Sequence, residues 1–144
     1  MGFGVDRVPT NYKVLGLHQL TYTQTTAATH TTFQDEGLSK SVDYGPSRIL
    51  RVSIQVHAQA NGGANSLYFK IMRGSTDLIR FLIPDPPVTL EYSTYWSYVF
   101  NGPVAAGTEI FKVQFAAVSA NTQVATIASA AIPRVLLIED LGPQ

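Results

Sequence analysis

Residues 48–59 have the sequence RILRVSIQVHAQ, in which apolar and polar side chains alternate with a period of two. The apolar set comprises Leu50, Val52, Ile54, Val56 and Ala58. The polar set comprises Arg51, Ser53, Gln55 and His57. Because successive side chains of a β-strand point to opposite faces, this stretch predicts a strand with one buried face and one solvated face.

The same alternation continues toward the C-terminus. Asn61-Gly62-Gly63-Ala64-Asn65 predicts a hairpin loop, because its glycines can adopt positive φ. Further strands are predicted over 66–73, 77–83, 89–100, 109–118 and 134–141. A less certain one is predicted over 124–131, where small residues would also suit a helix. Short strands separated by turns every 8–12 residues are typical of sandwiches. The sequence therefore predicts an all-β, antiparallel, jelly-roll-like β-sandwich.

The predicted core follows from the alternation. Ten residues are expected to be buried: Leu50, Val52, Ile54, Val56, Leu67, Phe69, Ile71, Phe111, Val113 and Phe115.

The first 47 residues have a different pattern. The stretch from His18 to Phe33 is rich in threonine, which favours strands but leaves a polar surface. We predict an extended N-terminal arm with edge strands over 1–47 and a sandwich body over 48–144, within one domain. The arm is expected either to lie as a solvated edge or to pair with a neighbouring subunit or capsid. The body is expected to supply the globular fold without it.

Composition limits the classes of partner. Ten basic and ten acidic side chains give a net charge of zero, which argues against nucleic acid or anionic membrane held by charge. Only 14% of residues are charged while 45% are hydrophobic, so we expect a homo-oligomer. The absence of cysteine excludes disulfides and thiol catalysis. No signal peptide or apolar run long enough for a membrane-spanning helix occurs.

Few residues suggest chemistry. His18, His30 and His57 do not lie at metal-ligand spacing, and His57 is expected to face solvent or an interface. Glu139 and Asp140 are neighbours in a predicted strand, so they should point to opposite faces and cannot act as a catalytic pair. Nucleophile-elbow and phosphate-loop motifs are absent. We predict no enzymatic activity, no catalytic residues, no cofactor and no metal, although a metal site assembled from separate strands stays open.

The aromatic residues of 89–100 are the clearest candidates for contact with a partner. Tyr92, Trp96 and Tyr98 share one predicted face, and Tyr95 lies on the other. Such a cluster can fill a core or a subunit interface, or it can stack on sugar rings. Together with the threonine-rich segment, the predicted interface residues are Thr21, Thr23, Thr25, Phe33, Tyr92, Tyr95, Trp96 and Tyr98.

Several C-terminal motifs resemble a known group of proteins. The segments are GPVAAGT at 102–108, FKVQ at 111–114, ASAA at 128–131 and PRVLLIEDLGP at 133–143. Over roughly residues 48–143 the chain is similar to small jelly-roll-like virion structural proteins of tailed bacteriophages, especially those of actinobacteriophages. That resemblance implies a homotrimer located in the virion and assembled in the host cytoplasm.

The resemblance includes two kinds of virion protein. One is a capsid decoration, or cement, protein that binds the major capsid protein on the outer surface of the head. The other is a minor tail or receptor-binding protein that contacts host cell-surface glycans. We expect decoration, because the sequence contains no coiled-coil or collagen-like shaft of the kind a fibre needs.

Overall fold

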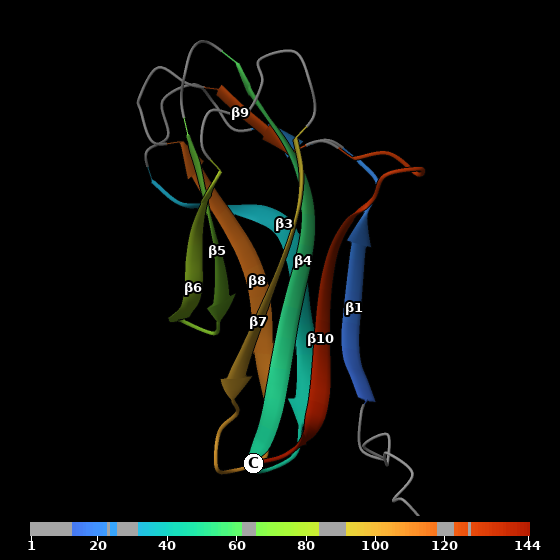
Figure 1. Ribbon diagram of the computed structural model, residues 1–144, viewed down its shortest axis with the longest axis vertical. Coiled ribbons are helices and arrows are strands. Elements are labelled where there is room, and N and C mark those ends of the chain that lie inside the picture. The colour runs from blue at the N-terminus through green and yellow to red at the C-terminus, as the bar shows by residue number, and fades with distance from the viewer. Residues whose placement is uncertain are drawn as a thin grey trace, which may run out of the picture.

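The computed structural model describes residues 13–22, 24–25, 32–61, 66–83, 92–117, 123–126 and 128–144. For residues 24–25, 59–61, 92 and 123–125 the backbone alone is described. The described part consists of strands and their connections (Figure 1). The strands are β1 (Lys13–Leu20), β2 (Gln24–Thr25), β3 (Gln34–Tyr44), β4 (Arg48–Asn61), β5 (Leu67–Arg73), β6 (Thr76–Ile83), β7 (Tyr92–Asn101), β8 (Gly107–Ala117), β9 (Gln123–Thr126) and β10 (Arg134–Pro143).

The strands pair as one long hairpin folded on itself. The innermost pair is β5 with β6, and around it lie β4 with β7, β3 with β8, β2 with β9, and β1 with β10. Every pair is antiparallel. Rolling such a hairpin so that its two halves face each other produces a jelly roll.

The rolled hairpin forms two sheets packed face to face (Figure 1). Sheet A has the order β1-β10-β4-β9-β2, with β7 on the other edge of β4. Sheet B has the order β3-β8-β5-β6. Strand β4 pairs along one edge first with β10 and then with β9, while β7 follows its opposite edge from Ile49 to Ala58. The predicted antiparallel, jelly-roll-like sandwich is confirmed.

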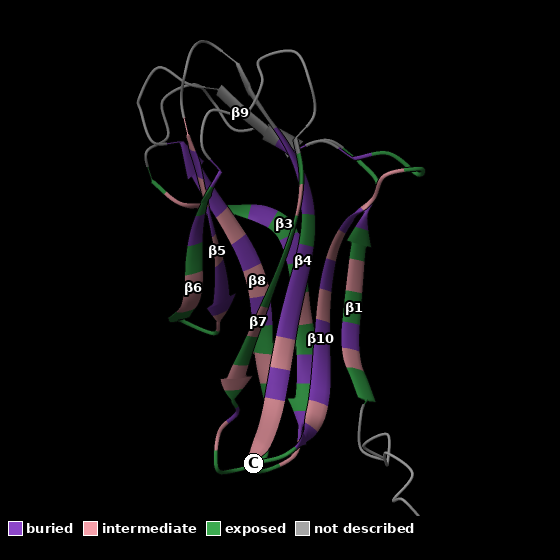
Figure 2. Cartoon of the chain, in the orientation of Figure 1, coloured by how far each residue is buried: buried purple, intermediate pink, exposed green. Residues whose placement is uncertain are grey.

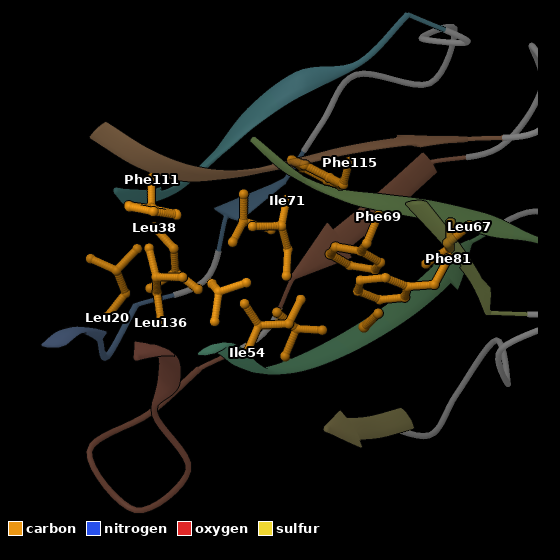
Figure 3. Packing of buried hydrophobic residues seen from close by; sticks show 14 of the residues in the cluster. Leu20, Leu38, Ile54, Leu67, Phe69, Ile71, Phe81, Phe111, Phe115 and Leu136 are labelled. Atoms are coloured by element: carbon orange, nitrogen blue, oxygen red, sulfur yellow. The ribbon is translucent and has the colours of Figure 1, made fainter. Parts of the chain in front are cut away.

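The core lies between the two sheets and contains the residues that the alternation of apolar and polar side chains predicted to be buried. All ten residues predicted to be buried have no exposed surface. Figure 2 shows buried and less buried residues alternating along β8 and β10. In Figure 3 the rings of Phe69, Phe81 and Phe115 lie at one end of this core; Phe69 stacks on Phe81 at 5.7 Å and on Phe115 at 6.0 Å between centroids.

The region before residue 48 contributes edge strands to the sandwich. Strand β1 pairs with β10 and β3 pairs with β8, and their residues Leu20, Leu38 and Val42 belong to the core. The division at residue 48 into an arm and a body that folds without it stays a prediction. Residues 1–12, and residues 23 and 26–31 of the threonine-rich segment, lie outside the described residues.

The burial of β3 alternates with a period of two, but the sequence pattern does not reveal it, because the charged residues Glu36 and Lys40 occupy two of its inward positions. Its register to β8 shifts between Asp35 and Ser39, next to Gly37 at φ +100°.

A buried ion pair holds one end of the sandwich together. The Arg134 side chain at the start of β10 and the Glu36 side chain in β3 are both fully buried and in direct contact. Nη1 of Arg134 also donates to the Glu36 carbonyl oxygen at 2.9 Å and to Thr126 Oγ1 of β9 at 2.7 Å. Nη2 donates to the carbonyl oxygen of Tyr22 at 2.8 Å. One guanidinium thus connects β10, β3, β9 and the segment after β1.

Two opposing effects act on the Glu36 carboxyl. Burial raises its pKa, while the Arg134 guanidinium and the hydrogen bonds from Thr126 and the Leu38 amide oppose that rise. The carboxylate is therefore retained inside the protein by a nearly complete set of partners. Removing one partner from such a pair leaves a buried charge without compensation.

Truncating a core ring should test the assignment of faces. We expect Phe111→Ala to lower the free energy of unfolding by about 3–5 kcal/mol, from lost burial plus the cavity left behind. Its neighbour Ile110 is 52% exposed on the opposite face of β8, so Ile110→Ala is the matched control and should cost less than about 0.5 kcal/mol. Urea denaturation measures both values. Equal costs at the two positions would contradict the assignment.

The ion pair gives a second prediction. Glu36→Ala should cost about 3–5 kcal/mol, because Arg134 stays buried without its counter-ion. The double variant Glu36→Leu with Arg134→Met removes both charges and should recover a large part of that loss. The control is Asp35→Ala, at an exposed neighbouring carboxylate, with an expected cost of at most about 1 kcal/mol. Thermal and urea unfolding of the four proteins checks this, and a Glu36→Ala cost no larger than that of Asp35→Ala would refute it.

Candidate interaction surface

The outward-facing side of sheet A, called here the outer face of sheet A, is almost free of charge. The register places Leu17, Leu137, Ser53 and Ser97 in one row across β1, β10, β4 and β7. The adjacent row is Gln19, Val135, Gln55 and Tyr95. Two small serines at the centre of the first row, joined by an Oγ–Oγ hydrogen bond of 3.2 Å, leave no bulky side chain there.

The charges that do lie on this face neutralise each other. Val14, Glu139, Arg51 and Val99 form the third row, and Arg51 Nε lies 2.6 Å from Glu139 Oε2. The pKa of Glu139 is raised by burial. Around this pair Val14, Leu17, Tyr95 and Val99 stand between 47% and 63% exposed. The outer face of sheet A thus combines exposed apolar side chains with a single internal ion pair among its described residues.

The outer face of sheet B has the opposite character. Lys112 Nζ lies 3.1 Å from Asp35, and Lys70 Nζ lies 3.0 Å from Asp77, which also contacts Arg80 at 3.2 Å. The hydrogen bond from Gln114 lowers the pKa of Asp35, and the one from Lys70 lowers the pKa of Asp77. Exposed ion pairs of this kind are compatible with permanent hydration. We therefore expect any contact with an apolar partner surface to form on the outer face of sheet A.

Strand β7 carries the predicted aromatic cluster and splits it between two environments. Tyr95 lies on the outer face and is 63% exposed. Trp96 points inward, where its ring stacks on Phe81 of β6 at 4.4 Å between centroids, yet 36% of the residue stays exposed. Tyr98 is half-buried and stacks on Phe100 at 6.0 Å. The Tyr92 side chain is not described.

The other predicted interface residues do not join this cluster. Phe33 lies beside sheet B, with Lys70 Nζ 4.6 Å and the Arg80 guanidinium 4.9 Å from its ring centroid. Thr21 is exposed, Thr25 is described only as backbone paired with Ala125, and Thr23 is outside the described residues. The side chains of this set that the structure describes therefore lie in separate parts of the molecule.

The main residues that sequence reasoning missed are Leu17, Leu137, Val14 and Val99. The alternation in β7 already places Val99 beside Tyr95 on the outward face. No local signal identifies Leu17 and Leu137 as neighbours of Ser53, because that row depends on the register of strands far apart in the chain.

The described residues that the sequence analysis considered for catalysis or metal binding make ion pairs or hydrogen bonds within the fold. Glu139 and Asp140 point apart as predicted; Glu139 pairs with Arg51, and Asp140 accepts from Arg48 Nε at 2.9 Å. His57 is 2% exposed, so it does not face solvent; the alternative that it faces an interface stays a prediction. Its Nδ1 lies 2.6 Å from Ser93 Oγ.

His18 Nδ1 accepts the Ser39 amide hydrogen at 3.0 Å, while His30 lies outside the described residues. Within the described ranges no group of three or more His, Asp or Glu side chains could hold a metal ion, and no helix there could cross a membrane.

Comparisons with known proteins find a shared fold. No protein-family model and no curated protein sequence matches the chain. A chain in the structure of infectious bursal disease virus, Gt strain, superposes with a TM-score of 0.53 at 10% identity, covering 90% of this chain and 38% of that chain. The Gx strain gives a TM-score of 0.44 at 11% identity, covering 87% and 37%. The jelly-roll sandwich is therefore a fold also found in a viral protein, of whose length this chain spans 38%.

The Trp96–Phe81 stack gives a prediction that fluorescence can check, because Trp96 is the single tryptophan of the chain. Phe81→Leu removes the ring that covers one side of the indole, so we expect a red-shifted emission maximum and stronger quenching by acrylamide. Leu82→Ala is the control, since Leu82 is the exposed neighbour in the same strand. Identical quenching in wild type and Phe81→Leu would show that the stack does not form in solution.

Proposed function

We propose that the chain is a virion structural protein, a decoration protein that binds the outer surface of a bacteriophage head. Two findings support this proposal: the jelly-roll fold shared with a viral chain, and the resemblance of residues 48–143 to phage virion proteins. The observation that carries it is the nearly uncharged outer face of sheet A. A monomer that stays free in water has little need for a face on which Leu17, Tyr95 and Val99 are all about half exposed.

The proposed mechanism is cementing of the assembled shell. A protein that contacts several capsid subunits at once adds binding free energy to the assembled state alone, and so shifts the equilibrium toward it. The resemblance implies a homotrimer, in which three contacts to the shell act together and hold more strongly than one. Low charge suits such a permanent contact, because interface cores are depleted of charged side chains.

A second candidate is a minor tail or receptor-binding protein that contacts host glycans. The feature that favours it is Tyr95, a mostly exposed ring on a strand whose other described rings, Trp96, Tyr98 and Phe100, are less exposed. Aromatic rings of this kind can stack on sugar rings. Trp96 and Tyr95 point to opposite sides of β7, so a sugar would stack on one ring rather than on a row.

Co-sedimentation with purified heads of the phage that encodes the chain tests the main proposal. Leu17→Glu places a charge on the outer face of sheet A and should weaken binding at least about tenfold, equivalent to about 1.4 kcal/mol. Ile110→Glu, at a similarly exposed residue on the outer face of sheet B, is the matched control and should bind as wild type does.

The outcomes separate the candidates. Loss of binding in Leu17→Glu alone supports decoration through sheet A. Equal binding by both variants would exclude that face. Electron microscopy of labelled protein on tails rather than heads, together with binding to a glycan array, would instead support the receptor-binding candidate.

A further inference from the structure

Strand β7 presents a free edge that lacks the usual protection. Among the described residues β7 pairs with β4 alone, through ten consecutive residue pairs without a register shift. Its sequence, YSTYWSYVFN, contains no charged residue, proline or glycine. Natural proteins usually protect an open edge strand with charges, prolines, bulges or a covering segment, because its backbone N–H and C=O groups can pair with another chain.

The other long edge strands of the described sandwich carry such protection. Strand β1 has a register shift between Val14 and Gly16 and packs against β3, where a Cβ at Gly16 would meet Val42 at 2.6 Å. Strand β3 has its own register shift and three exposed or half-buried charged residues, Asp35, Lys40 and Asp43. Strand β6 carries Asp77 and Arg80. The contrast indicates that β7 is kept open for pairing.

We propose that the free edge of β7 pairs with the same edge of a second copy of this chain, antiparallel and about a two-fold axis through Ser97. Antiparallel pairing places directly opposed residues on the same face of the sheet. With Ser97 on the axis, Ser93 to Asn101 overlap completely, Tyr95 lies opposite the partner's Val99, and Trp96 lies opposite the partner's Tyr98. The two most exposed apolar side chains on the outward side of β7 then cover each other.

The residues of β7 complement each other across the two-fold axis, and for this reason we propose a second copy of the chain as the partner. Aromatic residues opposite β-branched ones are favourable cross-strand pairs, and by symmetry this register makes two pairs of Tyr95 with Val99 and two of Phe100 with Thr94. No charge from either β7 enters the contact. Sheet A would continue across the axis, so the nearly uncharged outer face would double in extent.

The pairing does not depend on the virion role. An isologous contact closes with two copies. If the chain also forms the trimer implied by the resemblance, the β7 contact would join neighbouring trimers rather than build one.

A single cysteine tests the register, because the chain has none of its own. Directly opposed residues have Cα atoms about 4.5–5.5 Å apart, within the range that a disulfide spans. Ser97→Cys should therefore oxidise to a covalent dimer at twice 15.7 kDa on non-reducing gels. Gln55→Cys is the matched control: it is exposed on the same face but one strand further from the axis, and it should stay monomeric on the gel.

A charge at the axis tests the contact without cross-linking. Ser97→Lys places two ammonium groups opposite each other and should shift the native mass, measured by light scattering, from dimer to monomer. Gln19→Lys, exposed at the far edge of the same face, should leave the mass unchanged.

Two results would overturn the proposal: absence of the Ser97→Cys dimer, or a native mass that Ser97→Lys does not change. Formation of the Ser97→Cys dimer by a protein that binds no heads would support the pairing while refuting the decoration role.

Discussion

Arg134 and Glu36 form the contact on which the architecture most depends. Removing both charges from water costs several kcal/mol per ion, and the hydrogen bonds to Glu36, Thr126 and Tyr22 are what offset it. These partners come from both sheets, and they meet where β9 and β10 succeed each other along β4. A one-residue slip of β10 would move Arg134 out of reach of Glu36 and leave a charge buried without a partner. The ion pair therefore specifies register at a place where apolar packing alone tolerates alternatives.

The outer faces of the two sheets differ in how many charged side chains they carry. Sheet B surrounds its outer face with Asp35, Lys70, Asp77, Arg80 and Lys112, which are paired and hydrated. The outer face of sheet A carries one ion pair among its described residues, between Arg51 and Glu139, and a group of exposed apolar side chains. With only 14% charged residues in the whole chain, the concentration of charge on one sheet leaves the other suited to contact with protein. The fold supplies the surface, and the surface is where function has to be sought.

The parts of this structure that could be predicted from sequence are those set by short-range alternation. Strands β4, β5 and β8 alternate cleanly, and every core residue predicted from them is buried. Strand β3 was hidden, because the charged residues Glu36 and Lys40 occupy two of the positions that face inward. The ion pair between Glu36 and Arg134 could not be predicted from the sequence, since the two residues are 98 positions apart in the chain. Tyr95 was identified from β7 itself, whereas its neighbours across the sheet depend on long-range register that no local pattern encodes.

The nesting of the strand pairs has a consequence for how the chain is made. Strand β10 lies between β1 and β4 in sheet A, so the sheet stays divided until residues 134–143 have been synthesised. The β5–β6 hairpin can close early, but each enclosing pair joins segments further apart, which slows folding. A chain interrupted before Arg134 would leave β1 without its partner and β4 with one long edge unpaired, a state prone to aggregation. Closure of this sandwich therefore has to wait until residues 134–143 have been synthesised.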